Sequence, residues 1–123
     1  MNNPKVTNKT GIDISVTTNY LKHQSNPLID NYAFSYTITI RNNRDDSVKL
    51  LSRHWIITDK IDHVEEVKGK GVVGQQPIIE PGNSFQYSSG TVIRSKIGDM
   101  RGSYTMEDSK GEIFEAEVPL FVL

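Results

Sequence analysis

Apolar and polar side chains alternate with a period of two along most of this chain, and this pattern limits the fold more than any other feature. A period of two places successive side chains on opposite faces of a β-strand, whereas an amphipathic helix needs a period of about 3.6. In the clearest segment, from Tyr32 to Arg41, small or polar residues separate Tyr32, Phe34, Tyr36, Ile38 and Ile40. This segment is predicted to be a strand with one buried face.

Weaker alternation predicts further strands. They cover Ile12 to Thr17, His63 to Lys68, Ser84 to Thr91, Met100 to Met106 and Ile113 to Val118. The segment from Ser47 to Asp59 is also apolar at alternate positions, but its phase changes near Leu50. A β-bulge near Leu50 would explain the change of phase.

Turn-forming residues separate these segments, and no segment has a sustained helical period. The turns are predicted at Asn42-Asn43, at Pro81-Gly82, at Ile97-Gly98-Asp99 and, as a hairpin, at Ser109-Lys110-Gly111. Seven or eight short strands without intervening helices favour an all-β fold, an antiparallel β-sandwich. No repeat or linker divides the chain, so residues 1–123 are expected to form one domain, with Asn2 to Thr10 fraying.

Composition excludes several classes of function. The 123 residues carry 14 basic and 15 acidic side chains, and the isoelectric point near 6.3 gives no reason to expect nucleic-acid binding. The absence of cysteine excludes disulfides, thiolate zinc sites and thiol nucleophiles. Neither a secretory signal nor an apolar run of roughly 18 residues is present, so a cytoplasmic protein without membrane insertion is expected.

The segment from Gly69 to Gly74 has the GxGxxG spacing of a dinucleotide-binding loop. Such a loop holds a pyrophosphate because it follows a strand and opens a helix. Here Pro77 and then Pro81 follow too closely for a helix to form. We expect instead a loop whose glycines, Gly69, Gly71 and Gly74, take positive φ or allow close packing, although its free N–H groups could form an anion nest.

A second cluster is Arg53-His54-Trp55. Trp55 shares the parity of the apolar residues around it and is expected to fill the core, with its indole N–H satisfied nearby. Arg53 has the same parity, so it needs a strand end, a bulge or a partner carboxylate, whereas His54 points the other way. His23, His54 and His63 have no short metal-ligand spacing.

Catalysis has little support in the sequence, and an enzyme is not expected. Ser88-Ser89 lies beside Gly90, but no GxSxG motif surrounds either hydroxyl. The acidic pairs, Asp45-Asp46, Glu65-Glu66 and Glu115/Glu117, are interpreted as solvated surface charges.

Several motifs together resemble the ApaG family. They are Leu50 to Trp55, Glu66 to Pro77, Pro81-Gly82, Tyr87 to Gly90, Gly98 to Met106 and Phe114 to Phe121. The resemblance extends from about Ile12 to the C-terminus. Ser95-Lys96-Ile97 departs from it, since a Thr-Pro pair is expected before Gly98, and this bears on the stiffness of that turn.

The resemblance implies a fibronectin type III-like, immunoglobulin-like β-sandwich, in agreement with the period of two. It also implies an association with cobalt resistance and magnesium efflux in bacteria. Similar domains at the C-terminal side of certain eukaryotic F-box and polymerase-interacting proteins look like binding modules. Neither association names a reaction.

The first functional hypothesis is a non-enzymatic binding module. The loop from Gly69 to Pro77 and the adjoining strands would hold an unidentified protein partner or a small anionic ligand such as phosphate. The candidate contact residues are Arg53, His54, Lys68, Gly69, Lys70, Gly71, Gly74 and Gln76. No cofactor is expected, and a homodimer through an exposed strand edge stays open.

Two alternatives come from other classes. A nucleotide- or pyrophosphate-binding protein could use the GxGxxG loop, because Lys68 and Lys70 flank its glycines, but a Walker lysine and a magnesium-binding motif are missing. Direct binding of a divalent metal is motivated by the efflux association and the scattered histidines. A net charge of −1 offers no obvious acidic cage, so no metal site is assigned.

Overall fold

The computed structural model describes residues 6–7, 10–60 and 63–123. Most of the segment that was expected to fray, Asn2 to Thr10, lies outside the described residues. Within it, the short strand β1 (Val6–Thr7) pairs antiparallel with β2 (Ile12–Tyr20).

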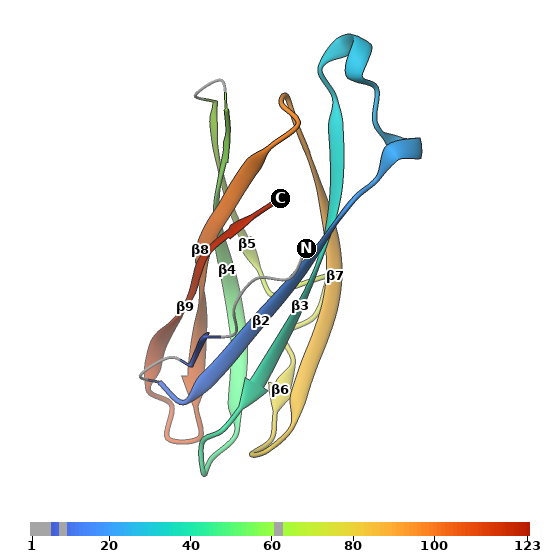
Figure 1. Cartoon of the computed structure of the whole chain (residues 1–123). Helices are drawn as coiled ribbons and strands as arrows, with labels where there is room; N and C mark the ends of the chain where they lie inside the picture. The colour runs from blue at the N-terminus through green and yellow to red at the C-terminus, as the bar shows by residue number, and fades with distance from the viewer. Residues whose placement is uncertain (1–5, 8–9, 61–62) are drawn as a thin grey trace.

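Two antiparallel sheets pack face to face, as Figure 1 shows. The first sheet has the order β1-β2-β3-β7, with β3 at Tyr32–Asn42 and β7 at Ser84–Ile93. The second has the order β5-β4-β8-β9, with its strands at Val64–Lys70, Val48–Asp59, Gly98–Asp108 and Ile113–Val122. The predicted antiparallel sandwich is therefore confirmed.

Three short elements were not predicted from the sequence. The two-residue strand β6 (Ile78–Ile79) pairs with β4. Two 3₁₀ helices, η1 (Lys22–Gln24) and η2 (Pro27–Ile29), lie in the connection from β2 to β3. These elements are too short for a side-chain period to reveal them.

The predicted bulge near Leu50 is confirmed, because the pairing of β4 with β8 shifts between Leu50 and Ser52. A second shift lies in the pairing of β8 with β9, where Val118 and Phe121 both point into the core although their numbers differ in parity. The extra residue of a bulge changes the phase of the pattern in both strands. The second bulge was not predicted.

The turn predicted at Ile97-Gly98-Asp99 lies slightly earlier in the chain. Gly98 begins β8, and a Cβ there would lie 2.5 Å from Ile93 Cδ1 and 2.8 Å from the Thr58 oxygen, so this glycine serves close packing. The turn is held by Ser95, whose Oγ donates to the Ile97 carbonyl at 2.7 Å and accepts the Lys60 N–H at 3.0 Å.

The core is centred on Trp55, which is 2% exposed. Its ring lies 5.8–6.0 Å, between centroids, from the rings of Tyr36, Tyr104 and Phe121. The predicted core position is confirmed, but the predicted partner for the indole N–H is not found. Within the described residues Trp55 Nε1 has no hydrogen-bond partner, because aromatic rings surround it.

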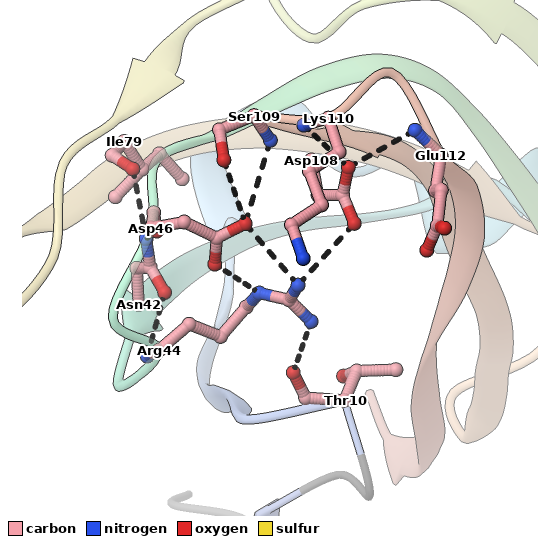
Figure 2. A network of polar contacts seen from close by, with 9 residues as sticks. All are labelled: Thr10, Asn42, Arg44, Asp46, Ile79, Asp108, Ser109, Lys110 and Glu112. Carbon is pink, nitrogen blue, oxygen red and sulfur yellow. Dashed lines mark hydrogen bonds and ion pairs between the residues drawn. The ribbon is translucent and has the colours of Figure 1, made fainter.

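A polar network connects the β3–β4 loop to the β8–β9 hairpin (Figure 2). Arg44 Nε donates to Asp46 Oδ1 at 2.8 Å, while Arg44 Nη2 lies 3.5 Å from Asp108 Oδ2. Asp46 also accepts the Ser109 hydroxyl at 3.2 Å, and the hydrogen bond from Arg44 lowers the pKa of Asp46 to about 2. Asp46 is thus an ion-pair partner rather than the solvated charge that the sequence analysis predicted.

The described part of the chain contains no helix that is long and apolar enough to cross a membrane.

Candidate functional site

The glycine-rich segment forms a tight hairpin on the edge of the second sheet. Strands β5 and β6 both pair with β4, and residues 71–77 connect them. Val72 and Gln75 exchange backbone hydrogen bonds of 2.8 and 2.9 Å, and Val73 and Gly74 between them have φ of 43° and 78°. Two central residues with positive φ define a type I′ turn. Because no helix follows Gly74, the GxGxxG spacing does not build a dinucleotide loop here.

The other two glycines of this spacing are required by close approaches. Gly71 has φ of 63°, and a Cβ on it would collide with the carbonyl oxygen of Gln75. A Cβ on Gly69, which pairs with Arg53 across β4 and β5, would lie 2.7 Å from Arg53 Nη1. The predicted roles of these glycines, positive φ or close packing, are therefore found.

Arg53 occupies an inward position on β4, and its guanidinium passes over Gly69. Its Nη1 donates to the carbonyl oxygens of Gly71 at 2.8 Å and of Lys70 at 3.4 Å. Among the described residues no carboxylate pairs with Arg53, and its Nε and Nη2 have no hydrogen-bond partner. The guanidinium is held in place by neutral oxygens while two of its nitrogens remain available as donors.

A pocket of about 280 Å³ opens between the two sheets beside the hairpin. Its lining comes from both sheets and from the turn: Tyr36, Arg53, Lys70, Val72, Val73, Gly74, Tyr87 and Ser89. The charged side chains among them are cations, and neither aspartate nor glutamate belongs to this set. We call this space the intersheet pocket.

Two tyrosines from opposite sheets meet at the base of this region. Tyr87 Oη lies 2.6 Å from Tyr104 Oη, and Tyr104 is completely buried. Burial raises the pKa of both phenols, so both stay protonated at neutral pH. If Tyr104 donates to Tyr87, the Tyr87 hydroxyl keeps its own proton for a group in the intersheet pocket.

The remaining predicted contact residues do not reach this pocket. His54 and Lys68 lie opposite each other on the outer face of the second sheet, where His54 Nε2 is 2.6 Å from Glu66 Oε2. The hydrogen bond from His54 lowers the pKa of Glu66. An open groove of about 530 Å³ includes His54, Lys68 and an acid, Glu115, and it shares Arg53 and Lys70 with the intersheet pocket.

Gln76 has a structural contact instead, because its Nε2 donates to the Leu51 carbonyl at 2.9 Å and holds the loop against β4. The three histidines are not brought together. Within residues 6–7, 10–60 and 63–123, no group of three or more His, Cys, Asp or Glu side chains could hold a metal ion.

Comparison with known proteins identifies a family that shares this sequence and fold. A family model described as the ApaG domain matches residues 22–108. The chain belongs to the ApaG family. Protein ApaG of Pseudomonas putida strain W619 is 55% identical over 112 residues, which cover 91% of this chain and 89% of that protein. Protein ApaG of Azoarcus sp. strain BH72 is 50% identical over 112 residues, with 91% and 88% covered. The crystal structure of an ApaA protein from Bordetella pertussis has a TM-score of 0.88, 44% identity and 91% coverage of both chains.

The intersheet pocket lies inside the matched ApaG domain. Five of its lining residues were not predicted as site residues: Val72 and Val73 of the turn, and Tyr36, Tyr87 and Ser89. Tyr36, Tyr87 and Ser89 belong to the first sheet, whereas the predicted residues all belong to the second sheet or its loop. The alternation in β7 shows which side chains point inward. Only the packing of the two sheets shows that Tyr87 and Ser89 face Arg53.

Proposed function

We propose that this protein is a non-enzymatic binding module that holds a small anionic group in the intersheet pocket. The observation that supports it most directly is the guanidinium of Arg53, held by carbonyl oxygens in a pocket whose lining includes no acid. Cations and hydrogen-bond donors without a counter-charge favour a negatively charged occupant.

The donors available to such an occupant come from both sheets. Arg53 offers Nε and Nη2, and the hydroxyls of Tyr87 and Ser89 complete the set. The volume of about 280 Å³ lies just below the roughly 300–1,000 Å³ of sites for drug-sized ligands. A phosphate, a pyrophosphate or a carboxylate fits this space better than a complete nucleotide.

The same lining supports binding rather than catalysis. It contains no histidine or carboxylate that could act as a general base. Its tyrosine, Tyr87, has a raised pKa and therefore serves as a donor of hydrogen bonds, not as a base. The association with cobalt resistance and magnesium efflux, which the ApaG resemblance implies, would then act through a cytoplasmic partner rather than through a coordinated metal.

Calorimetry with phosphate, pyrophosphate and ATP, each with and without magnesium, tests this proposal. We expect saturable binding of pyrophosphate that does not require magnesium. Arg53→Gln should weaken it about tenfold, the loss of one charge-assisted contact. Lys68→Gln is the control, because it removes a positive charge from the outer face of the neighbouring strand and should leave the affinity unchanged.

Arg53→Lys provides a second variant, since it keeps the charge but removes the donor fork. It should also weaken binding if the guanidinium contacts the anion. Absence of saturable heat with all three ligands, or equal losses in Lys68→Gln and Arg53→Gln, would contradict the proposal. Tight binding of ATP alone would favour the nucleotide-binding alternative.

A further inference from the structure

One edge of the sandwich lacks the devices that usually prevent strand addition. An exposed sheet edge is normally protected by shortness, by charged side chains, by proline or by a bulge. Strand β1 has two residues, β5 carries lysines and glutamates, and β9 contains Pro119, two glutamates and a bulge. In contrast, the ten residues of β7, Ser84–Ile93, include neither proline nor a charged side chain.

The outer edge of β7 is also open. Within the described part of the chain, β7 pairs with β3 and with no other strand, and its backbone makes no further hydrogen bonds. Alternate residues of an antiparallel edge strand direct their N–H and C=O groups away from their neighbour. Gln86, Ser88, Gly90 and Val92 are exposed along this edge, which borders the sandwich in Figure 1. About half of the backbone groups of β7 are therefore available to another strand.

The intersheet pocket opens beside this edge. Tyr87 and Ser89 line the pocket from the inward face of β7, while Arg53 and Lys70 line it from the second sheet. A strand added to β7 would extend the first sheet over the edge of the second. Its inward side chains would follow those of Tyr87 and Ser89 and would point toward Arg53.

We propose that β7 binds an extended segment of a partner protein as an added strand, and that an aspartate or glutamate of this segment occupies the intersheet pocket. This inference rests on the proposed function and names the chemistry of the partner. Backbone hydrogen bonds to β7 would supply affinity, and the acidic side chain would supply specificity.

Charge argues for an acidic segment over a second copy of this chain. Pairing of β7 with β7 of another copy would bring two intersheet pockets, each with an uncompensated Arg53, to the same interface. Like charges facing one another oppose association, whereas a carboxylate complements the guanidinium.

A synthetic peptide tests the inference on the full-length protein. The probe is a blocked seven-residue peptide of alternating threonine and valine with glutamate at its centre, so that glutamate and valine share one face of the strand. NMR titration and amide hydrogen exchange would be recorded on the protein. We expect shifts along Ser84–Ile93, slower exchange of the outward amides of β7, and about tenfold weaker binding when glutamine replaces the glutamate.

Two further comparisons distinguish the contribution of the β7 edge to binding from that of the intersheet pocket. Peptides N-methylated at alternate residues, made in both phases, should differ, because only one side of an added strand bonds to β7. Arg53→Gln should weaken binding of the glutamate peptide but not of the glutamine peptide, and Lys68→Gln should affect neither.

Equal binding of both methylated peptides would show that the peptide does not add to β7 as a strand. Equal binding of the glutamate and glutamine peptides would show that no acidic side chain occupies the intersheet pocket. Broadening of the β7 amides with protein concentration alone, together with a dimeric mass, would assign the edge to a second copy and also overturn the inference. If the peptide fails to bind while pyrophosphate gives saturable heat, only this inference fails. Failure of both ligands rejects the proposed function as well.

Discussion

Replacing each phenol of the Tyr87–Tyr104 pair by phenylalanine should destabilise the fold unequally. The two hydroxyls lie 2.6 Å apart and connect β7 of one sheet to β8 of the other. Among the described residues, each of these hydroxyls has only the other as a hydrogen-bond partner. Their surroundings differ, because Tyr104 is 0% exposed whereas Tyr87 is 7% exposed and lines the intersheet pocket.

The magnitudes follow from which hydroxyl is left behind. Tyr87→Phe leaves the Tyr104 hydroxyl buried without a partner, which costs about 1–3 kcal/mol. Tyr104→Phe leaves the Tyr87 hydroxyl at the pocket, where water can reach it, so only the net worth of the hydrogen bond is lost, about 1 kcal/mol. The double variant removes both polar groups together. It should be no less stable than Tyr87→Phe alone, so the two effects are not additive.

Urea unfolding followed by the fluorescence of Trp55, the single tryptophan, measures these free energies. The Trp55 ring lies 5.9 Å from that of Tyr104, so the probe reports on the same part of the core. Unchanged m-values would show that all variants unfold in the same way. Additive losses, or a larger loss for Tyr104→Phe than for Tyr87→Phe, would refute the reasoning about burial.

Four other substitutions in the hairpin and the polar network have expected outcomes. Gly74→Ala should lower the free energy of unfolding by about 1–2 kcal/mol, because alanine disfavours the left-handed φ of this position. Gly71→Ala should lower it further, because the new Cβ also meets the Gln75 carbonyl. Urea titration of both variants measures the two losses. Val73→Asn should raise the free energy of unfolding by about 0.5–1 kcal/mol, because asparagine tolerates the left-handed φ of 43° better than valine and the side chain is largely exposed. An unchanged melting temperature would contradict this. The depressed pKa of Asp46 contributes stability that is complete above its ordinary value of 3.8 and is lost as pH falls through about 2. Asp46→Asn should therefore flatten acid unfolding in that window, measured by circular dichroism.

The strands were predictable because a sheet with one buried face requires apolar and polar residues to alternate along each strand. The segment Tyr32 to Arg41 shows this, since Phe34, Tyr36, Ile38 and Ile40 are all buried in β3 (Tyr32–Asn42). Two other buried residues of β3, Ala33 and Asn42, do not follow the apolar pattern. Even the bulge near Leu50 left a signal, because an extra residue reverses the parity. The bulge before Phe121 left the same signal, and the prediction stopped at Val118 before reaching it.

The intersheet pocket was less predictable, because its residues come from strands that are distant in the sequence. Arg53 was identified, but so were His54 and Lys68, which the pleat places on the outer face of the sheet. Lys70 shares the parity of Lys68 and borders the pocket at the end of β5. Parity alone separates Arg53 from His54. It cannot reveal that Tyr87 lies across from Arg53, since this depends on how the two sheets are stacked.

Two arginines of this protein show that the same side chain can either form a structural ion pair or remain available to bind an anion. Arg44 lies against the carboxylates of Asp46 and Asp108, which neutralise its charge and fix the loop that carries it. Arg53 is fixed instead by the carbonyl oxygens of Lys70 and Gly71, which orient the guanidinium without cancelling its charge. If a carboxylate stood in place of these carbonyls, it would form a structural ion pair with Arg53, as Asp46 does with Arg44. The missing side chain of Gly69 allows the guanidinium to reach those carbonyls. The glycine-rich spacing therefore supports anion binding here by positioning an arginine, and not by wrapping its own N–H groups around a phosphate.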